Sequence, residues 1–404
     1  MRDWLPRQAR RRALASDRIM GSLELFGYQR VEVPPFEYAD VLEKGFVNVE
    51  AAVRFVEPET GKIAALRSDV TPQIARLAAS RYPNGPWPAR LCYQASVMRR
   101  RHERGRLEQK VRQVGFELVG LPEQAGDLEV LEAATSALRA AGVSEFTVDL
   151  AHAEVAGKLL DQLAPAPRAE ALECLALKDS AELRHVGVRA GLGARDLEAL
   201  VALPSLHGGE ELWPRAERAL AGTAAEGPLR SLHGIWSRAV AENLAPRFVV
   251  DLGETREFYY YTGAMFHLLA EGPGEPLGSG GRYDTLFERF DLPSPAAGFA
   301  FDISNVCWAL EAAGIGEPPV QRVLVQAADA DAGRRLARAL RARHVTCALG
   351  PEQDCTRHAA GWDYTHLLVL GSARTELKHL PTGTALPLAA KNLAEIAQNV
   401  AAHL

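Results

Sequence analysis

The segment 111–119 alternates apolar and polar side chains as a β-strand does, and its polar side could bind a small ligand. Alternation places three apolar side chains on one face of that strand: Val114, Phe116 and Leu118. Gln113 and Glu117 point to the other face, and Gly115 between them leaves room above the strand. An amide and a carboxylate can accept hydrogen bonds from an amine or an imidazole N–H. One face of an antiparallel sheet is also commonly wet, so simple solvation explains the same pattern.

An acid and a hydroxyl stand between a hairpin strand and a helix. The helix is expected to begin near Pro72, with Thr71 as its N-cap, and capping alone would account for that threonine. Asp69 could pair with the ammonium group of a ligand if its side chain points into a cavity. The residues by themselves leave the capping and binding interpretations open.

Three consecutive tyrosines, Tyr259 to Tyr261, follow closely on Arg256. In a strand they place aromatic rings with polar tips on both faces, so one face can be core and the other the wall of a pocket. Arg256 lies between Glu254 and Glu257, and a surface ion pair is the commoner role for an arginine in such company.

Two further segments are chemically suggestive but ambiguous. The glycine-rich segment 278–284 lacks the spacing of a dinucleotide-binding loop or a P-loop, so it either yields space to a ligand or forms a flexible hairpin tip. The segment 99–106 contains five arginines, which could grip phosphates or form a solvated loop. No H-E-x-x-H, cysteine cluster or G-x-S-x-G motif suggests metal or nucleophile chemistry.

These side chains need a sheet to position them, and the periodicity predicts one. Helical spacing predicts a helix that ends at Gly27, and a helical insertion over about 122–245. Strands are expected at 28–33, 53–56, 63–67, 90–98, 111–119, 146–150, 247–252, 258–269 and 298–303. A linker at 317–319 separates a domain spanning 1–315 from a small α/β domain at 320–404, which has a β-α-β-β pattern.

Length and composition limit the possible functions. The chain has 404 residues, too many for one hydrophobic core. Its 46 basic and 51 acidic residues give a net charge of −5, so no overall field recruits nucleic acid or an anionic membrane. No run of about 18 apolar residues predicts a membrane span. Five cysteines without a C-x-x-C pair indicate a reducing, cytoplasmic location.

Taken together and in order, these segments resemble the core of class II aminoacyl-tRNA synthetases, specifically the histidyl enzyme, over about residues 8–315. The opening helix and strand resemble the dimer-forming motif 1. Residues 93–99 and 113–117 resemble motif 2, and 255–263 and 280–284 are similar to the two histidine-specific segments. The resemblance implies an α+β fold, with an antiparallel sheet flanked by helices, a helical insertion and a small C-terminal α/β domain.

The same resemblance implies a histidine-binding pocket. Its residues would be Asp69, Thr71, Arg99, Gln113, Glu117, Arg256, Tyr260, Tyr261 and Tyr283. Asp69 stands where the family has a glutamate for the α-amino group, and Arg256 matches the arginine at the reacting carboxylate. Because Glu117 belongs to a polar strand face, its replacement by alanine is expected to weaken histidine binding and to cost little stability.

The segments that would bind ATP depart from the synthetase pattern. Motif 3 of the family ends in Gly-Leu-Glu-Arg, whereas residues 302–305 are Asp-Ile-Ser-Asn, so Asn305 replaces the arginine that clamps the nucleotide. Arg101 puts a positive charge where the family has a carboxylate, and Tyr259 replaces an aspartate. Amino-acid activation depends on fixed cations around the transferring group, so efficient adenylate formation is not expected.

A histidyl-synthetase core with such an altered ATP site resembles the regulatory subunits of ATP phosphoribosyltransferase. The resemblance implies no catalytic residues, metal or cofactor of its own, and a homodimer within a hetero-oligomer with the short catalytic subunit. The chain would activate that subunit in the first step of histidine biosynthesis and transmit feedback by L-histidine, without binding tRNA. The alternatives are a divergent histidyl-tRNA synthetase, favoured by Arg99, Arg256 and the C-terminal segment, and a related module for another amino acid or partner.

Overall fold

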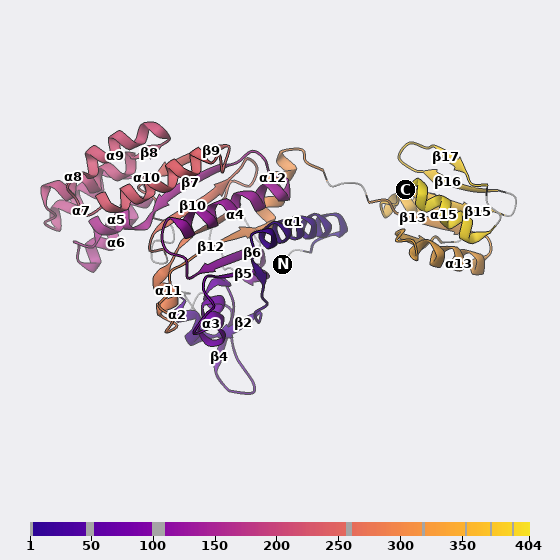
Figure 1. Ribbon diagram of the computed structural model, residues 1–404, viewed down its shortest axis with the longest axis horizontal. Helices are drawn as coiled ribbons and strands as arrows, with labels where there is room; N and C mark the ends of the chain where they lie inside the picture. Colours follow the sequence, from indigo (N-terminus) through magenta and orange to yellow (C-terminus); the bar gives the residue numbers. More distant parts are fainter. Residues whose placement is uncertain are drawn as a thin grey trace. The chain divides into compact units, whose positions relative to one another are not determined.

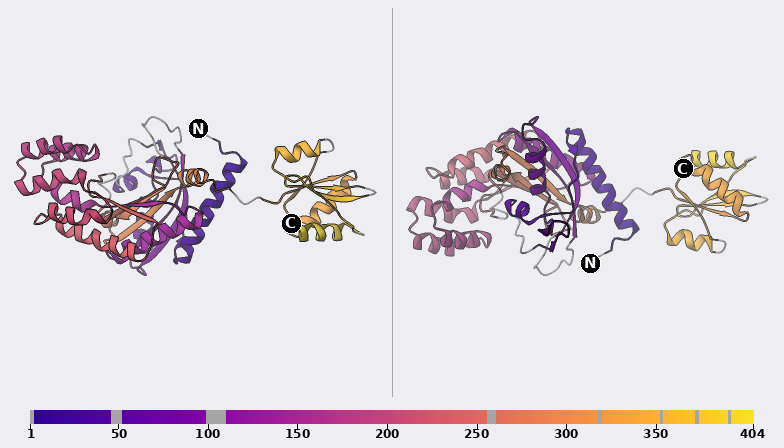
Figure 2. Two further views of the ribbon diagram at one scale, coloured as in Figure 1. Left: turned by 90° about the horizontal axis from the view of Figure 1, so that it is seen from above. Right: turned by 90° about the horizontal axis from the view of Figure 1, so that it is seen from below.

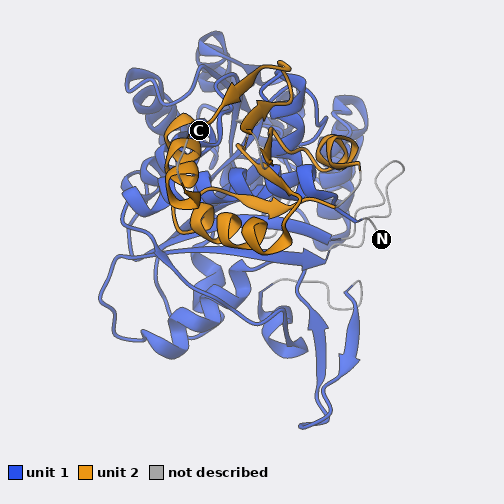
Figure 3. Cartoon of the chain, turned by 90° about the vertical axis from the view of Figure 1, so that its right-hand side faces the viewer, with its two compact units in different colours: residues 1–316 blue, residues 317–404 orange. Residues whose placement is uncertain are grey.

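The computed structural model describes residues 3–45, 52–98, 110–255, 261–316, 320–351, 354–371, 374–389 and 392–404. The chain divides into two compact units, Met1–Gly316 and Glu317–Leu404 (Figure 3). Each unit has its own sheet and its own clusters of buried apolar side chains. No helix in the described part of the chain is long and apolar enough to cross a membrane.

Unit 1 is built on a sheet of nine described strands, most of them paired antiparallel (Figures 1 and 2). In spatial order these are β1 (Gln29–Arg30), β5 (Ala89–Met98), β6 (Lys110–Val119), β12 (Ala296–Asp302), β11 (Gly278–Arg282), β10 (Ala264–Leu269), β7 (Thr147–His152), β9 (Arg247–Asp251) and β8 (His207–Gly208). Parallel pairing occurs between β1 and β5 and between β7 and β9. Strands β5 and β6 form a long hairpin in the sheet.

One face of this sheet is covered by three helices: α1 (Pro6–Leu25), α4 (Ala125–Ala141) and α12 (Ile303–Ala312). Ile19 and Leu23 of α1 are fully buried in the core that also contains Phe116 of β6. The predicted first helix is therefore confirmed. It ends just before Gly27, whose φ of +82° lies in the left-handed region where glycine carries no Cβ penalty.

The opposite face of the sheet is covered by α3 (Thr71–Arg81) and by the short helix α11 (Asp284–Glu288). Ile74 of α3 packs in one cluster with apolar side chains of β5 and β6. This is the face that carries Gln113 and Glu117, which are only 3% and 1% exposed. Solvation therefore does not explain the polar pattern of β6, because α3 removes the face from water.

A smaller sheet in the order β2-β4-β3 and the helix α2 (Ala39–Lys44) complete this side of unit 1. Its strands are β2 (Phe36–Tyr38), β4 (Ile63–Leu66) and β3 (Arg54–Val56). The predicted hairpin is confirmed: the carboxylate of Glu57 accepts the backbone N–H groups of Glu59 and Thr60 at 2.9 and 2.8 Å in its turn.

The strand expected at 28–33 is shorter in the structure, where β1 covers only Gln29–Arg30. Val31 still donates its backbone N–H to Cys92 at 2.9 Å. Pro34 and Pro35 have no backbone N–H that could hydrogen-bond to a neighbouring strand, so the chain leaves the sheet there.

Segment 278–282 is also corrected: it is the interior strand β11 and not a flexible hairpin tip. A Cβ at Gly278 or Gly280 would collide with the ring of Phe299 on the neighbouring strand. These two glycines therefore make room for core packing.

The strand expected at 258–269 begins at Ala264, and residues 256–260 lie outside the described part of the chain.

Between β7 and β9 the chain forms a group of helices beside that edge of the sheet (Figure 1). They are α5 (Ala153–Leu160), α6 (Pro165–Ala176), α7 (Ser180–Arg189), α8 (Ala194–Ala202), α9 (Trp213–Leu220) and α10 (Glu226–Ala241), with short 3₁₀ turns at Leu203–Ser205 and Glu210–Leu212. The helical stretch that starts at residue 122 thus contributes α4 and β7 to the sheet core before these helices begin.

The described residues of unit 2 form a five-stranded mixed sheet in the order β14-β13-β15-β16-β17. The strands are β14 (Cys347–Leu349), β13 (Val323–Ala327), β15 (His366–Leu370), β16 (Thr375–His379) and β17 (Ala385–Pro387). Helices α13 (Ala330–Arg341) and α15 (Leu393–His403) share one apolar cluster with the sheet, and α14 (Cys355–Gly361) belongs to another. The expected β-α-β-β pattern is present, with α14 inserted before β15.

Candidate functional site

Glu117 of β6 is a buried carboxyl group on which three hydroxyl groups converge. Its Oε1 accepts hydrogen bonds from the Thr71 hydroxyl at 2.7 Å and from the Tyr93 hydroxyl at 3.4 Å. Its Oε2 accepts a hydrogen bond from the Tyr283 hydroxyl. These donors come from α3, from β5 and from the residue directly after β11, so the cluster exists only in the folded chain.

Two glycines allow these polar groups to meet inside a close-packed sheet. Gly115 of β6 is paired with Tyr93 of β5, and a Cβ at Gly115 would collide with the phenol of that tyrosine. Gly298 of β12 is paired with Glu117, and a Cβ there would collide with the carboxylate of Glu117 and the hydroxyl of Tyr283. The room that the sequence indicated above Gly115 is therefore occupied by an aromatic ring.

Thr71 is not the N-cap of α3. The cap position is Val70, which makes no side-chain cap hydrogen bond, and Thr71 is the first helical residue. Its hydroxyl donates to Glu117 instead, so the capping interpretation is wrong and the hydroxyl belongs to the site. Half-buried Asp69 accepts the Val70 backbone N–H at 2.7 Å.

Burial raises the pKa of Glu117 well above the usual range of a glutamate. Hydrogen bonds from Thr71 and Tyr93 oppose this rise, and the nearby negative charge of Asp69 adds to it. Burial and the proximity of Glu117 likewise raise the pKa of the Tyr93 hydroxyl. The carboxyl group is therefore held toward its protonated form, and a ligand that brings a cation or an N–H donor would favour its ionised form.

Gln113 lies on the same face of β6 and is buried as well. Its carboxamide oxygen is shielded from solvent and has no hydrogen-bond partner among the described residues. Buried polar atoms are nearly always paired, so this oxygen is suited to accept an N–H from a bound ligand.

Tyr261 and Tyr283 form an aromatic wall beside Glu117. Their ring centroids lie 6.3 Å apart, and the two side chains are 8% and 2% exposed as residues. Arg282, the last residue of β11, fixes this wall, because its buried guanidinium pairs with Asp127 at 2.7 Å and with Asp284 at 3.1 Å. The arginine of the Gly-Gly-Arg-Tyr-Asp segment is thus structural, and the tyrosine after it reaches the site.

The structure thus groups Thr71, Glu117 and Tyr283 by hydrogen bonds, with Tyr261 beside them and Asp69 close enough to affect the Glu117 carboxyl. Three predicted ligands, Arg99, Arg256 and Tyr260, lie outside the described residues.

Tyr93 is the member of the cluster that the sequence-based prediction missed. In the paired hairpin it lies opposite Gly115, and a tyrosine across from a glycine was the available signal. The exact register of the hairpin was needed to recognise it.

Asn305, which stands where a nucleotide-clamping arginine is expected, is 2% exposed. Its carboxamide nitrogen donates to the backbone carbonyl of Pro276 at 2.7 Å. Asp302 caps α12 by accepting the backbone N–H of Ser304 at 2.8 Å. Segment 302–305 therefore starts a helix, and its amide is used in packing. Among the described residues, no group of three or more His, Cys, Asp or Glu side chains could hold a metal ion.

Comparison with known proteins connects this geometry to relatives. The family model described as histidyl-tRNA synthetase matches residues 1–306. The ATP phosphoribosyltransferase regulatory subunit of Syntrophotalea carbinolica is 32% identical, over 94% of this chain and 91% of its own length. The protein of that name from Anaeromyxobacter sp. (strain Fw109-5) is 39% identical, over 78% of this chain and 92% of its own.

The fold comparison agrees with the sequence comparison. A solved structure of an ATP phosphoribosyltransferase regulatory subunit/histidyl-tRNA synthetase from Bacillus halodurans superposes with a TM-score of 0.79 at 26% identity. The match covers 91% of this chain and 96% of that one. The predicted class II aminoacyl-tRNA synthetase-like α+β fold is confirmed.

Proposed function

This chain belongs to the family of ATP phosphoribosyltransferase regulatory subunits, and we propose that it acts by controlling a separate, short catalytic subunit of that enzyme. It activates this subunit in the first step of histidine biosynthesis and performs no chemistry itself. L-histidine binds in the Glu117 pocket and lowers the activity of the complex. The complex is a cytoplasmic hetero-oligomer that contains a dimer of this chain.

The observation that carries this proposal is the buried carboxyl of Glu117 with its ring of hydroxyl groups. An imidazole N–H is a donor of the right kind for a carboxylate, and the nearby negative charge of Asp69 suits the α-ammonium group. Tyr261 and Tyr283 supply aromatic surface for the imidazole ring. Binding and inhibition are then linked: histidine must bind the low-activity state of the complex more tightly than the active state.

The altered ATP side supports a regulatory role over a synthetase role. The side chain of Asn305 is a neutral amide, so it cannot supply the delocalised, bidentate charge of an arginine. It is also buried and bonded to the Pro276 carbonyl. We therefore expect no histidine-dependent ATP–pyrophosphate exchange above background. A histidyl-tRNA synthetase assayed in parallel is the positive control, and robust exchange by the purified chain would contradict the proposal.

The direct test is reconstitution with a short catalytic subunit. The two chains are co-expressed and purified, and phosphoribosyl transfer to ATP is measured with and without this chain and with increasing histidine. We expect stable co-purification, activity that depends on this chain, and inhibition by histidine. Glu117→Gln should keep activation and lose sensitivity to histidine, whereas Glu173→Gln, an exposed carboxylate on α6, should behave as wild type. Failure to co-purify, or unchanged feedback in Glu117→Gln, would refute the proposal.

The dimer is expected to form through residues 8–37, as implied by the resemblance to motif 1. Leu25, at the end of α1, is 89% exposed in the single chain, as an apolar residue at a subunit contact would be. Sedimentation at micromolar concentration should show at least a dimer, and a monomer would count against this part of the proposal.

A further inference from the structure

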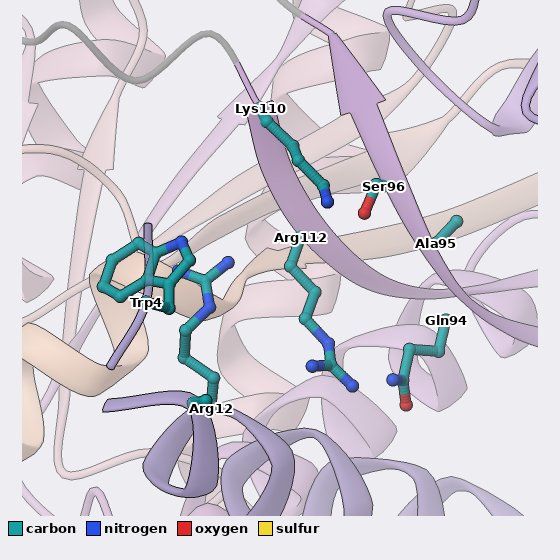
Figure 4. Close-up of a pocket in the computed structure, with 8 residues that line it drawn as sticks. Trp4, Arg12, Gln94, Ala95, Ser96, Lys110 and Arg112 are labelled. Atoms are coloured by element: carbon teal, nitrogen blue, oxygen red, sulfur yellow. The ribbon is translucent and has the colours of Figure 1, made fainter. Parts of the chain in front are cut away.

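A second polar pocket, of about 280 Å³, lies between the first turns of α1 and the ends of β5 and β6 (Figure 4). On the helix side it is lined by Trp4 and Arg12. The side chains that line it on the strand side are Gln94, Ser96, Lys110 and Arg112. Figure 4 shows Arg12 beside Trp4, Lys110 extending toward Ser96 and Arg112 extending toward Gln94 around this pocket.

This pocket is distinct from the Glu117 site. Side chains alternate along β6, so Lys110 and Arg112 point to the α1 side of the hairpin, whereas Gln113 and Glu117 point to the α3 side. A ligand in one site is separated from the other by the sheet itself.

The pocket is strongly cationic. Among the described residues that line it, three are basic and none is an aspartate or a glutamate. Lys110 and Arg112 form no ion pair with any residue in the described part of the chain. The pocket also borders the first two turns of a 20-residue helix, whose N-terminal end adds a partial positive charge.

Two of the three cationic groups, those of Arg12 and Arg112, are also held in place. The Arg12 guanidinium donates to the Ser304 hydroxyl at 2.6 Å and lies 4.1 Å from the centroid of the Trp4 ring. On the strand side, the side-chain amide of Gln94 is oriented with its oxygen toward Arg112. This oxygen accepts a hydrogen bond from Arg112 Nε at 3.2 Å. Arg12 is only 5% exposed, so its guanidinium is a fixed positive charge largely shielded from water before binding, whereas Arg112 is half-buried and Lys110 is exposed.

We propose that this pocket binds a small anion that carries a phosphate or pyrophosphate group. Planar guanidinium groups match phosphate oxygens in a bidentate manner, and three cations that line one pocket favour a multiply charged ligand over a single carboxylate. The volume suits a small molecule or the phosphate end of a larger one. The site goes beyond the regulatory function proposed above, because it requires neither histidine nor the catalytic subunit.

The test is calorimetric titration of the full-length chain with sodium pyrophosphate and, separately, with inorganic phosphate. We expect saturable binding at one site per chain, tighter for pyrophosphate, that weakens as salt is added. Arg112→Gln and Lys110→Gln should each lower the affinity on the order of 10-fold or more, since each removes a charge-assisted contact. Lys62→Gln, which removes an exposed lysine from the β3–β4 turn, is the matched control and should leave the affinity unchanged.

Three measurements make the outcome decisive. Absence of saturation at millimolar pyrophosphate would overturn the proposal. A loss of pyrophosphate affinity in Lys62→Gln as large as that in Arg112→Gln would also overturn it, because it would indicate general charge attraction. If Arg112→Gln leaves pyrophosphate affinity intact but weakens self-association in sedimentation, the pocket is a contact between copies and the proposal fails. Cooperative urea unfolding of Arg112→Gln should resemble that of wild type, which shows that the variant is folded without relying on the histidine-binding proposal. Arg112→Lys, which keeps the charge, should bind pyrophosphate with intermediate affinity.

Discussion

At the scale of single residues, Glu117 combines a binding role with a structural one. The expectation that its removal costs little stability depended on an open polar face, and the structure buries that face. Glu117→Ala would leave the Thr71, Tyr93 and Tyr283 hydroxyls without their acceptor and would open a cavity. Glutamine keeps the shape and one acceptor oxygen, so it is the better probe of binding.

Glu117→Gln is expected to weaken histidine binding on the order of 10- to 100-fold, because it removes a charge-assisted hydrogen bond worth about 1.5 to 3 kcal/mol. Isothermal titration of wild type, Glu117→Gln and the exposed control Glu173→Gln measures this effect. Equal affinities in all three proteins would show that histidine binds elsewhere.

The raised pKa of Glu117 also predicts how stability depends on pH. The folded chain holds the proton of this group more tightly than the unfolded chain, in which the pKa is about 4.3. The resulting stabilisation is therefore present below that value and is lost as the pH rises through the folded-state pKa. Glu117→Gln does not titrate at this position, so it should gain stability relative to wild type as the pH is raised. Urea denaturation of both proteins at several pH values tests this, and parallel stability profiles would contradict it.

At the scale of elements, the β5–β6 hairpin and β12 create the site through glycines placed opposite large or charged side chains. Gly298 is the critical position, because a Cβ there would overlap both the Glu117 carboxylate and the Tyr283 hydroxyl. Strand β12 forms part of the wall of the site, and the absence of a side chain at Gly298 leaves room for the Glu117 carboxylate and the Tyr283 hydroxyl.

Gly298→Ala should therefore destabilise the chain by roughly 1 to 3 kcal/mol, as overpacking of a core does, and should weaken histidine binding by displacing Glu117. The matched control is Gly21→Ala in the interior of α1, where a Cβ would meet no atom within 4 Å. That substitution should be neutral or stabilising by up to about 1 kcal/mol. Denaturant unfolding and titration calorimetry measure both effects, and a Gly298→Ala protein that matches wild type would refute the packing account.

At the scale of the whole molecule, the two units have separate cores, and the described site residues all lie in unit 1. We therefore expect a chain truncated after Gly316 to fold and to bind histidine with the affinity of the full-length protein. Calorimetric titration of the truncated and complete chains compares them directly. A large loss of affinity in a truncated chain that remains folded would show that unit 2 contributes to the site.

Much of this protein could be predicted from its sequence, because local patterns have local causes. Helical spacing predicted α1, turn residues predicted the β3–β4 hairpin, and alternation placed Gln113 and Glu117 on one face of β6. The fold was predicted from the resemblance of the ordered segments to class II aminoacyl-tRNA synthetases, and the relatives confirm it.

The tertiary structure alone decided what covers that face and which groups meet there. A period of two specifies which side chains share a face, but not what packs against it, and α3 comes from residues some forty positions earlier. Long-range packing therefore decided that the Thr71 hydroxyl donates a hydrogen bond to Glu117 and does not cap α3. It also placed the Tyr93 ring over Gly115. It also made 278–282 an interior strand, since glycines that suggest a loop can equally make room for the ring of Phe299 on a neighbouring strand.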